Sequence, residues 1–456
     1  MVRLSGVVGA AVVTTENARS AAADPLLRRL TASLDEPSAR KDEILETASR
    51  LFAETGLRTS LQDIADACGI RPGSLYHHFD SKEALVVELI ERYHAELDQL
   101  AANAAKELAD GDRSSAPEMV LALGIAIAQT GARHSAAVQF SFYEPPAGSD
   151  AELLRLANQR PTSVIAVMTD TLRLAHTAGL VRATVDIDLA AERLVSTMLY
   201  TATGLFEDHP VDRVAAVLCD VLIAGIAVDA PSNATLDRSE AMKAVREVIR
   251  TWEEPDADLD DRAARIHAAA RTEFGRRGYE VTTVRQIAAT AGVSTGAVYR
   301  VIGSKEELLA AITTSFMKKV MTGWNAALGS ESTAVEKIDA LTWMQINVVE
   351  RFSDEFKIEL AWLRQSPPET AMFTWSFHAA ARGLRTMLRD GVKAGQLRSM
   401  NVSGDLMARC LLALTWMPEG SLRTRETGQE SAPSSGEMSR TLALGRDTVL
   451  RGALKR

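Results

Sequence analysis

The feature that most constrains this chain is an internal repeat, because a segment that occurs twice must be a structural unit that folds twice. Residues 40–85 align with residues 262–308 when one extra residue is allowed in the second copy, and 15 of the 46 aligned positions are identical. The likeness continues downstream, where Ala-Gly-Leu-Val-Arg at 178–182 resembles Ala-Gly-Gln-Leu-Arg at 394–398. The repeated unit is therefore about 220 residues long, and the 456-residue chain holds two of them.

Both copies have the apolar pattern of helices. In the first copy the apolar residues of 44–52 recur every three to four positions, as on one face of a helix, and Gly56 then interrupts the pattern. Thr59 or Ser60 can cap a second helix, and Pro72 suits the first position of a third. Neither copy alternates between apolar and polar residues over a useful length, as a half-buried strand would. We therefore predict an all-α fold of two tandem units.

The start of each unit has the spacing of a helix-turn-helix, in which two short helices are joined by a tight turn. Gly69 in the first unit and Gly292 in the second mark this turn. In a DNA-binding helix-turn-helix, the second helix presents its first residues to base edges in the major groove. Lys82 and Lys305 fall in the first turn of the following helix, where a positive charge interacts unfavourably with the helix dipole. A phosphate bound at this helix start would make a lysine there favourable. The pattern predicts two DNA-binding heads, one in each unit.

The strings GIRPGSLYHHFDSKEAL at 69–85 and GVSTGAVYRVIGSKEEL at 292–308 resemble the DNA-binding domain of the TetR family of transcriptional repressors. The resemblance implies a three-helix DNA-binding domain joined to an all-helical regulatory domain that binds a small molecule and dimerises through a four-helix bundle. It covers nearly all of residues 40–456 and is specific at the two DNA-binding ends. The chain departs from the family in having two units. The second also has Val-Ile-Gly at 301–303, where the family usually has an aromatic pair and a polar residue.

Carried over position by position, the resemblance implies a set of DNA contacts in each head. The implied phosphate contacts near the recognition helices are Tyr76, Lys82, Tyr299 and Lys305. His77 and Arg300 would face bases or the adjacent backbone. The remaining implied contacts are Thr59, Ser60, Gln62, Arg71 and Ser74 in the first head and Thr282, Thr283, Arg285, Ser294 and Thr295 in the second. Since arginine can hold guanine through two hydrogen bonds and histidine makes one weaker contact, the two heads should prefer different half-sites.

Charge also separates the two heads. The whole chain has a net charge of −9, which argues against indiscriminate coating of nucleic acid and is compatible with a local basic face. Residues 40–92 carry 7 basic and 10 acidic residues, whereas residues 262–309 carry 8 basic and 4 acidic ones. The expected function is a sequence-specific transcriptional repressor acting on double-stranded DNA. A regulator in which only the first unit binds DNA is an alternative.

These patterns divide the chain into six segments. They are a flexible N-terminal extension (1–38), the first DNA-binding domain (39–92), the first regulatory domain (93–229), a linker with an amphipathic helix (230–260), the second DNA-binding domain (261–310) and the second regulatory domain (311–456). Residues 189–207 and 210–228 form a helical pair with a wide apolar stripe, and residues 405–417 and 438–454 are its counterpart. We expect these pairs to pack on each other as a pseudo-dimer within one chain, with a homodimer of chains as the alternative.

Aromatic residues are concentrated in the second regulatory domain, which holds five of the six tryptophans. An apolar cavity in a helical domain is where a family inducer would bind, although aromatic residues at helical spacing are more often core residues. The candidate ligand-binding residues are Phe140, Phe142, Tyr143 and Met168 in the first domain and Trp343, Phe373, Trp375 and Phe377 in the second. The expected effector is an apolar small molecule, such as a lipid or a sterol-like compound.

Two rival classes of protein fit the sequence less well. Residues 292–296 match the G-x-S-x-G pattern of serine hydrolases, but that motif needs a preceding strand and a helix precedes it here. No phosphate loop, dinucleotide fingerprint or zinc-binding histidine pair occurs, so we expect no enzyme, no cofactor and no metal site. A helical scaffold protein would leave the paired tyrosines and lysines without a purpose. Three widely spaced cysteines, and no apolar stretch long enough to span a bilayer, predict a cytoplasmic protein with no membrane partner.

Overall fold

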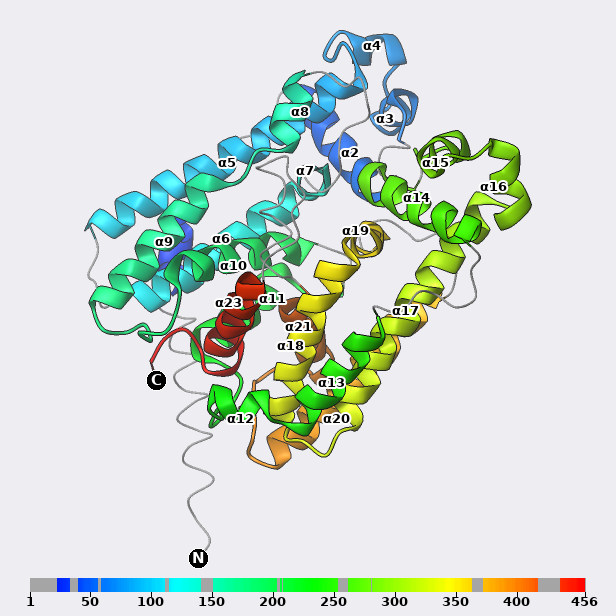
Figure 1. Cartoon of the computed structure of the whole chain (residues 1–456). Coiled ribbons are helices and arrows are strands. Elements are labelled where there is room, and N and C mark those ends of the chain that lie inside the picture. The colour runs from blue at the N-terminus through cyan, green and yellow to red at the C-terminus, as the bar shows by residue number, and fades with distance from the viewer. Residues whose placement is uncertain are drawn as a thin grey trace, which may run out of the picture.

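The computed structural model describes residues 23–32, 40–55, 59–110, 115–140, 151–202, 206, 208–252, 261–279, 281–362, 372–416 and 435–455, and it is built of helices (Figure 1). Over these residues, extended pairing is limited to two isolated bridges, Val181 with Leu454 and Ala227 with Leu397. The prediction of an all-α fold is therefore confirmed. None of the described helices is both long and apolar enough to cross a membrane.

The first unit begins with three helices of a DNA-binding head and continues as a bundle. Its helices are α2 (Arg40–Thr55), α3 (Leu61–Ala67), α4 (Pro72–Tyr76), α5 (Lys82–Asp110), α6 (Ala116–Arg133), α7 (Ser135–Phe140), α8 (Ala151–Ala157), α9 (Thr162–Thr177), α10 (Ile187–Leu199) and α11 (Val211–Ala224), with a short 3-10 helix η3 (Tyr200–Ala202) after α10. The long helix α5 buries residues from Leu85 to Ala104 along its length. It therefore belongs both to the head, at its start, and to the regulatory domain.

The second unit repeats this order. Its helices are α14 (Asp261–Arg277), α15 (Val284–Ala291), α16 (Thr295–Ile302), α17 (Lys305–Gly329), α18 (Ala334–Arg351), α19 (Ser353–Trp362), α20 (Met372–Lys393), α21 (Gly404–Trp416) and α23 (Ser435–Gly445), and a π-helical turn η5 (Arg446–Leu450) follows directly. Figure 1 shows the two heads, with α3 and α4 in one and α15 and α16 in the other, at the same end of the molecule. The regulatory helices lie together at the other end.

The segment expected to be a linker is packed into the second unit. It contains α12 (Asn233–Asp237) and α13 (Glu240–Thr251), and α13 packs on both α17 and α18. The apolar side of α13 is buried at Met242, Val245 and Ile249, and the ring of Trp252 meets the edge of Phe352 at 5.2 Å. The amphipathic helix is thus found, but its apolar face belongs to the core of the second regulatory domain. The acidic stretch at 253–258 lies outside the described residues.

A helix also precedes the first unit, inside the extension that was expected to be flexible. Residues 23–30 are helical, and Ala23 and Leu30 are buried. Asn103 of α5 donates a hydrogen bond to the carbonyl of Leu30 at 2.9 Å, and Arg29 pairs with Glu107 of α5 at 2.7 Å. Part of the extension is therefore docked along α5, because its apolar residues find a partner there.

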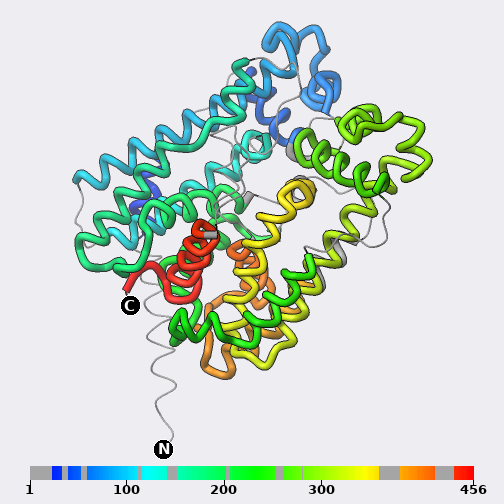
Figure 2. The backbone as a smooth tube through the Cα atoms, viewed as in Figure 1, coloured from blue at the N-terminus to red at the C-terminus, as the bar shows by residue number. Residues whose placement is uncertain are grey.

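The two regulatory domains pack on each other within the chain. Helix α11 of the first unit lies against α21 and η5 of the second, so that one continuous apolar core includes residues of both domains. Arg193 of α10, which is buried, donates to the carbonyl of Leu414 in α21 at 2.7 Å. Figure 2 shows the last helical segment of the chain lying where the two halves meet. The pseudo-dimer expected from the repeat is thus present in a single chain.

The centre of this interface is a pseudo-two-fold crossing of two backbones. The N–H of Arg182 donates to the carbonyl of Ala453 at 2.9 Å, and the N–H of Arg398, its counterpart in the repeat, donates to the carbonyl of Ile226 at 2.8 Å. The guanidinium groups of the two arginines repeat the symmetry, since they bond the carbonyls of Gly452 and Gly225 respectively. The two N–H bonds join the backbone of one half to that of the other, and their symmetric pairing fixes the register of the interface.

Gly225 and Gly452 lie where the two backbones come closest. Both have left-handed φ angles, of +70° and +83°. A Cβ on Gly225 would lie 2.4 Å from the backbone nitrogen of Gly452, and a Cβ on Gly452 would lie 2.3 Å from the backbone carbon of Ala224. Only glycine satisfies both the angle and the close approach.

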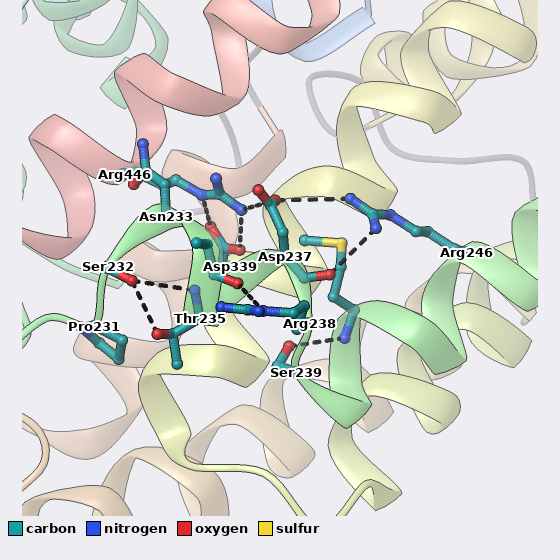
Figure 3. A network of polar contacts seen from close by, with 12 residues as sticks. Pro231, Ser232, Asn233, Thr235, Asp237, Arg238, Ser239, Arg246, Asp339 and Arg446 are labelled. Atoms are coloured by element: carbon teal, nitrogen blue, oxygen red, sulfur yellow. Dashed lines mark hydrogen bonds and ion pairs between the residues drawn. The ribbon is translucent and has the colours of Figure 1, made fainter.

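A buried ion-pair network ties the interface to the second unit (Figure 3). Arg446 of η5 makes two hydrogen bonds of 2.8 Å to Asp339 of α18, and a third of 2.8 Å to Asp237 of α12. Arg446 and Asp339 are 5% and 1% exposed, so little of the pair is in contact with solvent. Burial alone would lower the pKa of Arg446, but the hydrogen bonds that it donates to the two carboxylates raise that pKa above its ordinary value. Arg246 of α13 bonds Asp237 from the other side.

Candidate DNA interface

The first head is a compact helix-turn-helix whose local sequence sets each boundary. Ser60 caps α3 in a reciprocal capping box with Asp63, and the turn passes through Gly69 at φ +64°. Leu75 and Phe79 are buried and hold α4 and the following turn against the head. Because those two side chains point inward, the opposite side of α4 faces solvent.

The solvent-facing side of α4 carries most of the residues expected to bind DNA. Tyr76 is 53% exposed, although a tyrosine ring would normally be covered. Arg71, Ser74 and His77 are exposed beside it. An exposed aromatic hydroxyl with an arginine and a histidine next to it offers hydrogen-bond donors to phosphate and base edges.

The second head repeats the arrangement with different side chains. Thr283 caps α15 in a capping box with Gln286, and Gly292 ends it in the left-handed conformation. Ser294 caps α16 by accepting the N–H of Ala297, while Val298 and Ile302 are buried. The exposed face carries Tyr299, which is 51% exposed, together with Thr295 and Arg300. The equivalent tyrosines of the two heads are therefore presented in the same way.

Lys82 and Lys305 begin the next helices, α5 and α17, and both lie over aromatic rings. The Nζ of Lys82 is 5.9 Å from the centre of the Phe52 ring, and that of Lys305 is 4.2 Å from the centre of the Tyr279 ring. Burial lowers the pKa of Lys82 below its ordinary value, and Asp63 only partly offsets this effect. A phosphate beside the ammonium group would stabilise the charged form of the lysine, so this position is suited to binding an anion.

Two of the expected contacts do not fit the structure. Thr59 and Thr282 are both 2% exposed, so their hydroxyls cannot reach a phosphate. The hydroxyl of Thr59 donates to the carbonyl of Leu51 at 3.2 Å, and that of Thr282 donates to the carbonyl of Gly278 at 2.7 Å. In each head, this threonine hydroxyl holds the start of the second helix against the end of the first helix. The neighbouring Ser60 and Thr283 are the exposed hydroxyls at these helix starts.

The other expected contacts on the crossing helices are exposed. Gln62 lies on the solvent side of α3, where its amide donates to Asp66 at 2.8 Å, and Arg285 is exposed on α15. The G-x-S-x-G string lies between two helices, with its serine, Ser294, used as the cap of α16. No strand precedes it, so the geometry of a hydrolase elbow is missing from this described segment.

The candidate ligand-binding residues are only partly described. Met168 is fully buried in α9, and Phe140 is buried against Phe52 of the head, with ring centres 5.4 Å apart. Trp343 is half-buried on α18. Phe142 and Tyr143 lie outside the described residues, as do the side chains of Phe373, Trp375 and Phe377 in α20. Phe140 therefore lies in the contact between the regulatory domain and the head. The sequence pattern did not indicate this position.

A buried acid in the second head was also missed by the sequence analysis. Glu273 of α14 is 4% exposed and occupies the position of Leu51 in the first unit. It accepts a hydrogen bond from Thr290 at 2.8 Å and one from Arg277 at 2.7 Å. The one available signal was the replacement of an apolar helix position by an acid with arginines three and four residues later.

The fold and the two exposed faces define a protein with two helix-turn-helix heads on one helical body. The family model described as bacterial regulatory proteins of the tetR family matches residues 44–89 and 266–312, which are these two heads. The two heads are therefore tandem DNA-binding domains of the tetR type, as the sequence strings predicted.

Curated relatives match the chain over short segments. The transcriptional repressor KstR2 of Rhodococcus jostii is 58% identical over 57 residues, which are 12% of this chain and 28% of that protein. KstR2 of Mycolicibacterium smegmatis is 49% identical over 59 residues, 13% and 29% of the two chains. The matched segments thus span less than a third of these relatives.

Two solved structures of similar proteins each align with less than half of the chain. The ketosteroid transcriptional regulator KstR2 of Mycobacterium tuberculosis is 19% identical with a TM-score of 0.36, over 44% of this chain and 97% of its own. FadR of Bacillus subtilis, solved in complex with stearoyl-CoA, is 18% identical with a TM-score of 0.32, over 40% and 96%.

Proposed function

We propose that this chain is a sequence-specific DNA-binding transcriptional regulator, acting as a repressor in the cytoplasm and reading double-stranded DNA with two unlike heads. The observation that carries the proposal is the matched pair of exposed faces at one end of the molecule. Each face has a half-exposed tyrosine, Tyr76 or Tyr299, on the recognition helix and a lysine on the helix that follows. A scaffold protein has no use for two such faces.

The residues divide into those that position the head and those that read bases. Tyr76, Lys82, Tyr299 and Lys305 are the proposed phosphate contacts, because they lie at helix starts or on exposed helix faces. His77 and Arg300 are the proposed base-reading pair at equivalent positions. One good bidentate contact is worth about 1–3 kcal/mol of discrimination, enough for the two heads to select different half-sites.

The experiment that tests this function measures DNA binding against salt concentration, using fragments from around the protein's own gene. Lys82→Ala should weaken binding to every sequence and flatten the slope of log affinity against log salt by about one unit, since one phosphate contact is lost. Lys243→Ala is the matched control, because Lys243 is exposed on α13 and pairs with Glu240 on the same helix. An unchanged affinity and slope for Lys82→Ala would remove this lysine from the interface.

The contribution of the second head is tested in the same assay. Tyr76→Ala and Tyr299→Ala should each weaken specific binding, because each removes one phosphate contact from a different head. If Tyr299→Ala has no effect while Tyr76→Ala does, the protein reads DNA with the first head alone.

The same proposal includes an apolar effector that binds the second regulatory domain and releases DNA. Helix α18 buries Gln345 and Asn347, where the aligned positions of α6 are Ile127 and Gln129. The side-chain oxygen of Gln345 and the indole nitrogen of Trp324 are buried without a hydrogen-bond partner among the described residues. Such groups can anchor the polar end of an otherwise apolar molecule. An effector of this kind releases DNA only if it prefers the non-binding conformation.

The effector is tested by titrating tryptophan fluorescence with a panel of lipids and sterols. A binding compound should change the emission, and Gln345→Ile, which installs the residue of the first unit, should weaken that compound by about tenfold if one hydrogen bond to it is lost. Ile127→Val in the first unit is the control. No change with any member of the panel would contradict the effector proposal and leave the DNA-binding proposal intact.

A further inference from the structure

The two heads are joined to the body of the molecule in different ways. The buried core of the first head, including Ile44, Phe52 and Leu75, is continuous with the core of the regulatory domains. The buried core of the second head is a separate cluster, to which the regulatory helix α19 contributes Ile358. Packing cores are stiff, so a head that shares the main core is held more rigidly than one with a core of its own.

The contact in the first unit is apolar. Helix α7 packs on α2, and the rings of Phe140 and Phe52 meet edge to face at 5.4 Å. Ala136 and Ala137, which lie in α7 with Phe140, are also buried. An aromatic pair of this kind adds to ordinary apolar burial.

The equivalent contact in the second unit is polar. The segments ARHSAAVQF (132–140) and ERFSDEFKI (350–358) align, so Asp354 and Glu355 occupy the positions of Ala136 and Ala137. Arg271 of α14 pairs with Glu355 at 3.3 Å, and the hydroxyl of Thr272 donates to Asp354 at 3.1 Å. Glu355 is only 8% exposed, so its charge depends on Arg271 for compensation.

This polar contact also requires a close approach of two helices. A Cβ on Gly275 of α14 would lie 2.9 Å from the Cα of Asp354. The first unit has Ala53 at the aligned position. On the long helices, Ile90 of α5 is part of the continuous core, whereas its counterpart Thr313 in α17 turns its hydroxyl to the carbonyl of Leu309 at 2.9 Å. The apolar connection of the first unit is thus interrupted at two places in the second.

We propose that α14 and α19 form a polar latch that sets the orientation of the second head, with Arg271 and Glu355 as positioning residues, while the first head is fixed by apolar packing. This inference rests on the proposed function, because it concerns how the second head meets its half-site. Opening of the latch lowers the fraction of molecules whose second head is in place, and it lowers the affinity for that half-site by the same factor. The first half-site is unaffected.

Hydrogen–deuterium exchange of the full chain without DNA tests the latch directly. Glu355→Ala, which installs the residue of the first unit, should raise exchange in α15 and α16 by about fivefold and leave α3 and α4 unchanged, since losing one such contact shifts a local equilibrium by that order. Arg271→Lys keeps the charge and should retain most of the protection. Gly275→Ala should open the latch by steric contact, with Ala53→Gly in the first head as its matched control.

Separate DNA probes for the two half-sites provide the second readout. Glu355→Ala should lower the affinity for the half-site of the second head by the factor measured in exchange, with no change at the other half-site. Equal exchange changes in both heads, or none in the second, would overturn the latch. Wild-type protein that binds neither probe would refute the proposed function, while the exchange result without DNA would still decide the latch.

Discussion

At the scale of single residues, the buried pair of Arg446 and Asp339 should be sensitive to the loss of either partner. Arg446→Met would leave the carboxylate of Asp339 buried without its partner, and the free energy of unfolding should fall by about 3–5 kcal/mol. Asp237→Asn removes the second, 44% exposed partner of Arg446 and should cost less than about 1 kcal/mol. Denaturant unfolding measures both.

A control for this prediction follows from the residues that the first unit has at the same two positions. Leu121 and Cys219 lie at the positions of Asp339 and Arg446, and both are buried. The double variant Asp339→Leu with Arg446→Met should therefore recover most of the stability that Arg446→Met loses, because a buried ion pair is commonly replaceable by apolar residues. A double variant as unstable as the single one would show that the pair has a further role.

Some individual positions could be predicted from the sequence and others could not. Tyr76 and Tyr299 are exposed beside buried apolar neighbours, as the helical period indicated. Thr59 and Thr282 were placed among the phosphate contacts, because a sequence does not show that their hydroxyls bond the preceding helix. Arg446 and Asp339 are more than a hundred residues apart, so no local pattern connects them.

At the scale of secondary-structure elements, the crossing at Gly225 and Gly452 decides whether the two regulatory halves can close on each other. Gly452→Ala would add a strained left-handed residue and a clash with the backbone of Ala224, and we expect a loss of about 3–5 kcal/mol. Gly179→Ala is the control. Gly179 has φ +75° but no atom within 4 Å of a Cβ, so only about 1–2 kcal/mol should be lost.

Denaturation midpoints of the two glycine variants provide the comparison. A Gly452→Ala protein as stable as Gly179→Ala would mean that the crossing is not tightly closed. The sequence repeat revealed that two bundle-forming halves exist, but the glycines of the crossing lie outside the aligned strings. Likewise, α13 was visible as an amphipathic helix, whereas its partners α17 and α18 follow in the chain and only folding brings them together.

At the scale of the whole molecule, one chain has the organisation that a pair of TetR-family subunits would otherwise provide. The covalent link makes the association of the halves independent of protein concentration. It also allows the heads to diverge, since a symmetric dimer must present two identical heads to a palindromic site. Here Arg71, Ser74 and His77 of one head correspond to Ser294, Ala297 and Arg300 of the other.

The measurement that tests this account most directly is the mass of the protein–DNA complex, combined with footprinting of its operator. We predict one chain for each operator, with two protected half-sites of different sequence that cannot be interchanged without loss of affinity. The regulatory halves are already paired within the chain through Arg182 and Arg398, so no second chain is needed. Two chains on one operator, or one chain on a perfect palindrome with interchangeable halves, would contradict the account.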